Sequence, residues 1–296
     1  MSLLKSLINN IGYVSLIAVI ISNLSVFKKM IYKDEFGKGD LVVLSMIFSI
    51  FGIMGTYIGT EVHGAIANTR IIGVIAGGIL CGPFVGIVSG IIAGIHRFLY
   101  DVGGISTIPC AIATVLAGFG SAFLHIKGTK YPKWFYGFVG GFVLESLEMI
   151  LILLISRPYE HAFFIVKSIY LPMSLTNAVG ICILVLIIQK TVDEKEQMAA
   201  KQSELALDIA AKTLPYFRDI TKDSLRKICT IIKDSTGAAA VAITDKNTIS
   251  AHVGLGSDHH ISGESIQTIL TKEVMEQGEI RILNSAQEIK DGRAHV

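Results

Sequence analysis

Residues 71–99 read IIGVIAGGILCGPFVGIVSGIIAGIHRFL, an apolar block in which Arg97 is the only Asp, Glu, Lys or Arg residue. A membrane-spanning helix needs about 20 mostly apolar residues, so the middle of this block decides how the chain crosses the membrane. Cys81-Gly82-Pro83 interrupts it there, and a proline removes a backbone donor and favours a turn. We therefore expect two passes joined by a tight hairpin, with a single kinked helix as the alternative.

Apolar runs on both sides of this block extend the pattern to most of the first 189 residues. They predict seven passes, near residues 6–26, 41–60, 64–81, 83–100, 105–126, 135–156 and 163–188. A kinked helix at 71–99 would reduce the number to six. Glycines at Gly82, Gly86, Gly90 and Gly94 repeat every fourth residue, which predicts one helical stripe for close helix packing.

The basic residues of the short loops predict the orientation, because Lys and Arg favour the cytoplasmic side. Loops 27–40 and 127–134 and the segment after residue 189 contain most of the lysines, whereas the opposing loops hold Arg157 alone. Seven passes with the N-terminus outside put all three basic segments in the cytoplasm. We expect a multi-pass protein of a bacterial plasma membrane with its C-terminal part in the cytoplasm.

Composition changes sharply after residue 189. The mean hydropathy of the chain is +0.59, yet residues 1–189 contain only 20 of its 50 Asp, Glu, Lys and Arg residues. Residues 190–296 contain the other 30, a density ordinary for a soluble domain. We expect a membrane domain at 1–189, a linker helix at 190–214 and a soluble domain at 215–296. The net charge of +2 argues against nucleic-acid binding.

Polar residues at membrane depth are costly and are usually functional or paired. Arg70, Arg97 and Cys110 are expected at a similar depth in the outer half of the helices. Two guanidinium groups there would suit a small anion, since arginine binds carboxylates through two parallel hydrogen bonds. The candidate ligand-binding residues, with their polar neighbours, are Arg70, Arg97, Asn68, Ser106 and Cys110.

A second group of buried polar residues offers an alternative. Glu145 and Glu148 lie three residues apart in the expected sixth helix and so share one face, and Asn177 follows Pro172 in the seventh. The arginines could pair with these glutamates instead of binding a ligand. We interpret Glu145, Glu148 and Asn177 as structural or signalling residues, and we expect no catalytic residue in the chain.

Several motifs in this order resemble the membrane sensor region of LytS/YhcK-type proteins over roughly residues 25–190. They are Asn68-Thr69-Arg70, Gly82-Pro83-Phe84-Val85-Gly86, Gly94-Ile95-His96-Arg97, Gly103-Gly104, Pro109-Cys110, Glu145-Ser146-Leu147-Glu148-Met149 and Asn177-Ala178-Val179-Gly180. The resemblance implies the sensor of a histidine kinase that acts with a LytR-type response regulator. It also implies a link to murein hydrolase and cell-wall control and, in some branches, to small carboxylates such as pyruvate. The YhcK branch implies a diguanylate cyclase output instead.

The remaining sequence predicts signalling elements. Residues 190–214 form a polar helix with an apolar stripe at Val192, Met198, Leu205 and Ile209, which favours a short coiled coil and a homodimer; a plain linker helix is the alternative. The order helix, hairpin, helix and strand in 215–296 resembles an incomplete GAF domain, as do the motifs Ala251-His252-Val253-Gly254 and Gly256-Ser257-Asp258-His259-His260. His259 and His260 lack a third ligand nearby, so we expect no metal site.

Together these patterns predict a polytopic α-helical membrane domain of about seven helices, followed by a signalling helix and an α/β GAF-like domain that is truncated at residue 296. No phosphoacceptor histidine region, ATP-binding box, GGDEF-like sequence or P-loop is recognisable. ATP and Mg would bind in a kinase region outside this chain, and the chain itself is expected to hold no cofactor. A transporter-like binding protein is the competing function, since broken helices with buried charges also describe transporters.

Overall fold

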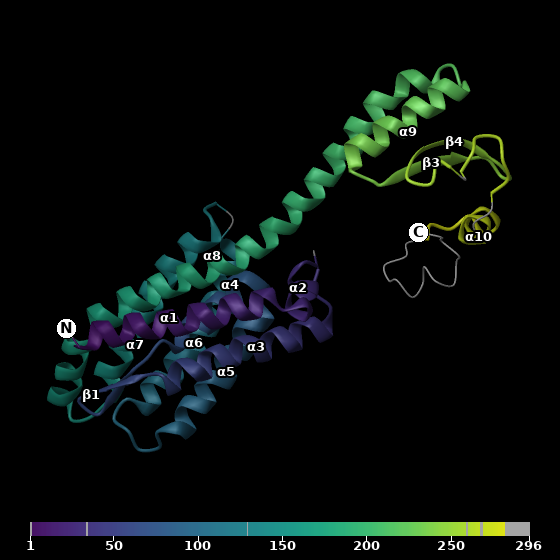
Figure 1. Ribbon diagram of the computed structural model, residues 1–296. Helices are drawn as coiled ribbons and strands as arrows, with labels where there is room; N and C mark the ends of the chain where they lie inside the picture. The colour runs from purple at the N-terminus through teal and green to yellow at the C-terminus, as the bar shows by residue number, and fades with distance from the viewer. Residues whose placement is uncertain (1, 34, 129, 259, 267–268, 282–296) are drawn as a thin grey trace. The chain divides into compact units, whose positions relative to one another are not determined.

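The computed structural model describes residues 2–33, 35–128, 130–258, 260–266 and 269–281. It divides into two compact units, residues 1–196 and 197–296, which are described separately. The first unit is a helical bundle (Figure 1). Its elements are α1 (Ser2–Asn23), α2 (Ser25–Ile31), α3 (Lys38–Tyr57), β1 (Thr60–Val62), β2 (Ala65–Ala67), α4 (Arg70–Cys81), α5 (Pro83–Tyr100), α6 (Thr107–Lys127), α7 (Lys133–Ile155) and the first part of α8 (Tyr159–Thr213).

Within the described ranges, six helices are long and apolar enough to cross a membrane: α1, α3, α5, α6, α7 and α8. The expected third pass, residues 64–81, is different. Its first residues form the second strand of a β-hairpin, and α4 is only 12 residues long, about 18 Å at 1.5 Å per residue. A helix of this length does not cross a hydrocarbon core of about 30 Å. The prediction of seven full-length passes is therefore wrong for this segment.

The hairpin that replaces this pass has a two-residue loop. Val62 pairs with Ala65, and His63 and Gly64 between them both have positive φ, at 53° and 79°. Two positive φ values are typical of the tight hairpin turn that matches strand twist. In Figure 1 the hairpin lies at the end of the bundle that holds the N-terminus. It delays the start of the helix to Arg70, which places this residue at a helix end and inside the bundle.

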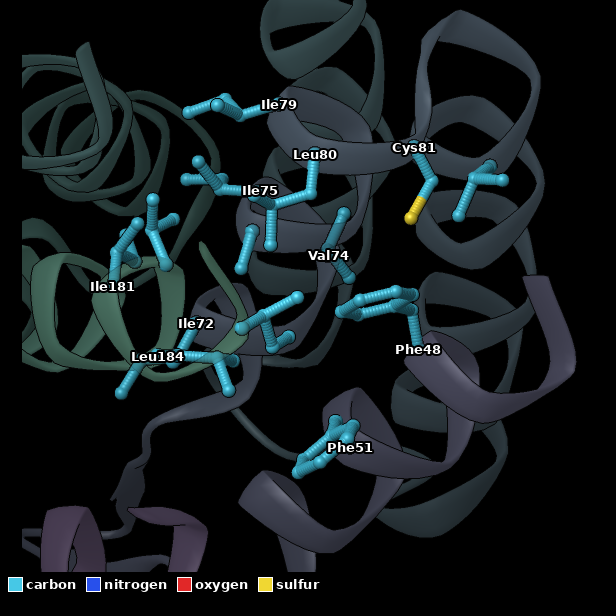
Figure 2. Packing of buried hydrophobic residues seen from close by; sticks show 14 of the residues in the cluster. Phe48, Phe51, Ile72, Val74, Ile75, Ile79, Leu80, Cys81, Ile181 and Leu184 are labelled. Carbon is cyan, nitrogen blue, oxygen red and sulfur yellow. The ribbon is translucent and has the colours of Figure 1, made fainter. Parts of the chain in front are cut away.

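Helix α4 is the centre of the bundle, since each of its residues is buried. Its apolar side chains contact Phe48 and Phe51 of α3 on one side and Ile181 and Leu184 of α8 on the other (Figure 2). A helix that is apolar all round belongs in a core. The pattern of residues 71–81 is therefore explained by burial in protein rather than by contact with lipid.

The turn between α4 and α5 confirms the expected hairpin. α4 ends at Cys81, Gly82 has φ 99°, and Pro83 is the first residue of α5. The glycine stripe of α5 also has the predicted packing role. A Cβ atom on Gly118 of α6 would lie 2.5 Å from the backbone oxygen of Gly86, a distance that only glycine permits.

Helix α8 is unusually long, with 55 residues, about 80 Å at 1.5 Å per residue. It continues through Pro172, although a proline removes one backbone donor from a helix. A membrane helix tolerates a proline when neighbouring groups satisfy the backbone. The helix extends through most of the predicted linker 190–214 and passes from the first unit into the second.

The second unit contains η1 (Leu214–Phe217), α9 (Lys222–Thr236), β3 (Ala240–Thr244), β4 (Ile249–Gly254) and α10 (Ile269–Gln277). Thr221 and Ser224 cap α9 reciprocally, and Gly237 ends it in the left-handed conformation. The buried face of α9 packs on an antiparallel pair formed by β3 and β4. Helix and hairpin follow the predicted order, but the described residues contain too few strands to show a GAF fold, and His259 lies outside them.

Candidate functional site

Arg70 is held in place by the residues that precede it. Asn68 accepts a hydrogen bond from the backbone nitrogen of Arg70 at 3.1 Å and donates its side-chain amide to the backbone oxygen of Ile66 at 2.9 Å. Asparagine forms such local turns readily because its side chain reaches the nearby backbone. Asn68 thus joins the hairpin to α4, which fixes where the arginine side chain begins.

The guanidinium of Arg70 is 0% exposed and contacts two other helices. Its Nε donates to Thr114 Oγ1 of α6 at 2.6 Å, and its Nη2 approaches the backbone oxygen of Cys110 at 3.4 Å. Nη2 also lies 3.3 Å from Glu148 Oε1 of α7. Nη1 has no hydrogen-bond partner among the described residues, so this nitrogen remains unused.

Arg97, in the last turn of α5, is the second fully buried arginine. Its Nη2 donates to Asp101 Oδ2 at 3.1 Å and to Ser106 Oγ at 3.3 Å. Its Nε and Nη1 have no partner within the described ranges. The Asp101 side chain is 29% exposed, so the Arg97 ion pair borders solvent, whereas the Arg70 ion pair is enclosed.

The start of α6 brings the two arginines to one surface. Ser106, Cys110 and Thr114 follow one another at intervals of four residues, and residues at this spacing share a helix face. Arg97 contacts Ser106, and Arg70 contacts Cys110 and Thr114. Since four residues rise about 6 Å along a helix, the two guanidinium groups lie one to two turns apart along the same stripe.

A second buried polar cluster adjoins Arg70. Asn177 of α8 donates its amide to Glu145 Oε2 at 2.7 Å and to the backbone oxygen of Asn68 at 3.1 Å. Glu145 and Glu148 are both 0% exposed, and only Glu148 contacts a cation among the described residues. The expected alternative, an arginine paired with a glutamate, is therefore present for Arg70 and Glu148, whereas Arg97 pairs with Asp101.

The structure brings the predicted ligand-binding residues together, with different roles. Arg70, Arg97 and Ser106 offer side chains to the site, and Cys110 contacts Arg70 through its backbone oxygen. Asn68 positions Arg70. Thr114 and Asp101 also belong to the site, but the sequence did not predict them. A threonine in an apolar helix is usually interpreted as a packing residue, and Asp101 as a loop residue. Thr114 lies four residues after Cys110, and Asp101 lies four residues after Arg97. This spacing, which brings side chains together on a helix, was the signal that could have identified them.

This arrangement suits anion binding better than catalysis. Three guanidinium nitrogens on two buried arginines have no partner in the described part of the chain, and guanidinium forks recognise carboxylates by paired hydrogen bonds. No group of three or more His, Cys, Asp or Glu residues that could hold a metal ion occurs among the described residues.

In the second unit, the rings of His252 and His260 lie 5.1 Å apart.

Comparison with known proteins identifies relatives that match most of the chain. The family model described as "5TMR of 5TMR-LYT" matches residues 24–191, more than half of the chain. The sensor histidine kinase YpdA of Escherichia coli K12 is 42% identical over 259 residues, which is 88% of this chain and 46% of that protein. The sensor protein LytS of Bacillus subtilis 168 is 36% identical over 308 residues, 97% of this chain and 51% of that protein.

A third relative, the sensor histidine kinase/phosphatase LytS of Staphylococcus aureus Mu50, is 32% identical over 309 residues, 98% of this chain and 52% of that protein. The chain thus spans about half the length of the curated relatives it matches. No solved structure matches it.

Proposed function

Because the chain belongs to the 5TMR-LYT family of membrane sensors, we propose that its first unit is the receptor part of a sensor histidine kinase that binds a small carboxylate. The proposed ligand is a 2-oxo acid such as pyruvate, bound in the outer half of the bundle. The observation that carries this proposal is the pair of fully buried arginines, Arg70 and Arg97, on one stripe of α6 with unused N–H donors.

The shape of the site favours a monocarboxylate with a second oxygen. The outer edge of Arg70, formed by Nη1 and Nη2, can bind one carboxylate by two parallel hydrogen bonds. Arg97 and Ser106, one to two turns away along α6, can then donate to the oxo oxygen. Because Asp101 keeps this end of the site at the solvent boundary, it also supplies the route by which a ligand enters.

The output of the receptor is proposed to be mechanical. α8 carries Asn177 within the buried cluster and continues without interruption to Thr213, so a displacement of the cluster is transmitted along one helix. In the relatives' longer chains, the next region would be the kinase, which would bind ATP and Mg. We propose a homodimer that acts through a LytR-type response regulator on genes of cell-wall and murein hydrolase control.

Orientation and the second unit belong to the same proposal. The N-terminus is proposed to lie outside a bacterial plasma membrane and the C-terminal unit in the cytoplasm, with the β1–β2 hairpin and α4 together making the third crossing in place of a full-length helix. The second unit, with its helix α9 packed on a strand pair, is proposed to be the first part of a GAF-like domain. A diguanylate cyclase would be the alternative output for the same receptor.

The experiment uses the full chain in lipid nanodiscs, titrated with pyruvate by isothermal calorimetry. We expect saturable binding that Arg70→Ala and Arg97→Ala each weaken by roughly tenfold to a hundredfold, because a charge-assisted hydrogen bond contributes about 1.5–3 kcal/mol. Arg157→Ala is the matched control, since Arg157 is exposed and donates to the backbone oxygen of Ser156, which is not a residue of the proposed site. Equal binding by all three variants would contradict the proposal.

A transporter is the second candidate, and one observation favours it. The β1–β2 hairpin and the short helix α4 form a discontinuous segment inside the bundle, as in transporters. Proteoliposomes into which the same chain is reconstituted distinguish the two functions. Counter-flow of labelled pyruvate would support transport, whereas binding without flux supports the receptor.

A further inference from the structure

The contact between Arg70 and Glu148 is weak for a buried ion pair. Charge-assisted N–H to carboxylate bonds usually measure about 2.7–2.9 Å, and a carboxylate can contact both outer nitrogens of a guanidinium at once. Here a single contact of 3.3 Å joins Nη2 to Oε1. Nη1 of Arg70 and Oε2 of Glu148 are buried with no partner among the described residues.

Arg70 does not depend on Glu148 for its orientation. The Nε atom is fixed by Thr114 Oγ1 at 2.6 Å, and Thr114 in turn donates to the backbone oxygen of Cys110 at 2.7 Å. The backbone of Arg70 is fixed by Asn68. These contacts come from α6 and from the loop between the hairpin and α4, so the guanidinium keeps its position if the α7 carboxylate moves away.

We propose that Glu148 is an internal competitor of the ligand and sets the affinity of the receptor. It occupies Arg70 in the free protein, and a ligand carboxylate takes its place with the two-pronged contact that Glu148 does not make. This inference rests on the proposed function, since it names what regulates that same site. Two carboxylates close to one buried guanidinium repel each other, so ligand and Glu148 exclude one another.

If Glu148 competes with the ligand, its removal changes the ligand affinity in the opposite direction from that expected if Glu148 supports Arg70. The apparent dissociation constant of a ligand rises as the fraction of binding-competent protein falls. If Glu148 leaves Arg70 free in about a tenth of the molecules, its removal tightens ligand binding about tenfold. If Glu148 instead held Arg70 in place, its removal would weaken binding.

Glu145 supplies a matched control on the same helix. Both glutamates are fully buried in α7, but Glu145 accepts its side-chain hydrogen bond from the neutral amide of Asn177. Glu145→Gln removes the same charge by the same change of atoms, without freeing an arginine. It therefore separates competition at Arg70 from a general effect of removing a buried carboxylate.

The test measures pyruvate affinity by calorimetry for the parent chain, Glu148→Gln, Glu145→Gln and Arg70→Ala in nanodiscs. We expect Glu148→Gln to bind about tenfold more tightly, Glu145→Gln to bind within about threefold of the parent chain, and Arg70→Ala to bind far more weakly. Glu148→Asp is the second variant if the glutamine variant does not fold. Its shorter side chain withdraws from Arg70 and keeps the charge, so binding should also tighten.

The outcomes separate this inference from the proposed function. If the parent chain binds pyruvate and both Glu148 variants bind it equally or more weakly, Glu148 supports Arg70 and the inference is wrong. Equal tightening by Glu145→Gln would also overturn it, because the effect would then be one of charge alone. If neither the parent chain nor any folded variant binds, the proposed function fails and competition for its ligand fails with it.

Discussion

Asn177 of α8 donates its side-chain amide to Glu145 of α7 at 2.7 Å, at the centre of the buried polar cluster. The same nitrogen donates to the backbone oxygen of Asn68, in the loop before Arg70. One amide therefore joins α7, α8 and the residue that positions an arginine of the candidate site. A buried carboxylate without a cation depends on such donors.

Replacement of Asn177 should destabilise the bundle. Asn177→Ala leaves Glu145 buried without its hydrogen-bond donor, a loss of about 1–3 kcal/mol, and Asn177→Asp adds a like charge and should cost more. Thermal unfolding in nanodiscs measures the effect. Ser168→Ala is the control, because Ser168 is exposed and bonds only within its own helix. Equal stability of Asn177→Ala and the parent chain would refute this role.

The second prediction tests the guanidinium geometry. In the proposed site Arg70 binds a carboxylate through two parallel donors, which an ammonium group cannot reproduce. Arg70→Lys and Arg97→Lys should therefore restore only part of the pyruvate affinity that the alanine variants lose. The measurement is the same calorimetric titration. Full affinity in both lysine variants would mean that only positive charge is required.

Close packing of α5 on α6 gives a third prediction. A Cβ atom on Gly118 would lie 2.5 Å from the backbone oxygen of Gly86, so Gly118→Ala must separate the helices. The expected loss is about 1–3 kcal/mol, as for other overpacked cores. Gly12→Ala is the control, because nothing lies within 4 Å of its added Cβ and alanine favours a helix. The midpoint temperature of thermal unfolding should be well below that of the parent chain for Gly118→Ala, and close to it or above it for Gly12→Ala.

Sequence patterns predicted those parts of the fold that depend on local chemistry. Gly82 and Pro83 mark the turn between α4 and α5 because one tolerates positive φ and the other begins a helix without a backbone donor. The hairpin before α4 gives no comparable signal. Its strands are three residues long, and its turn contains His63 rather than the usual Asn or Asp.

The candidate site was predictable in its members but not in its pairing. Buried arginines stand out in an apolar sequence because their cost is high. Whether Arg70 contacts Glu148 or Glu145 depends on the rotation of α7 about its axis. Three residues of offset on a helix put both glutamates near one face, so sequence alone leaves both pairings open. Glu148, not Glu145, contacts Arg70.

The fourth prediction concerns orientation. Tyr131, beside three lysines, should lie in the cytoplasm, and Tyr159, at the start of α8, should lie outside. Both side chains are exposed, so a cysteine at either position is accessible to an impermeant thiol reagent on its own side of the membrane. In intact cells Tyr159→Cys should react and Tyr131→Cys should not. The background is the labelling of the parent chain, which has four cysteines of its own. The reverse pattern would overturn the proposed topology.

The last prediction concerns the homodimer. The part of α8 beyond the first unit carries Met198 and Leu205 exposed, at 66% and 39% of their surface, on a stripe spaced as in a short coiled coil. Burial of such side chains against a second copy would stabilise a parallel pair, since buried apolar surface contributes about 25 cal/mol per Å². Leu205→Cys should therefore give a disulfide-linked dimer in membranes under mild oxidation. Glu204→Cys, one residue away on another face, is the matched control and should cross-link less. Equal cross-linking at both positions, or none at either, would show that this stripe does not form the dimer contact.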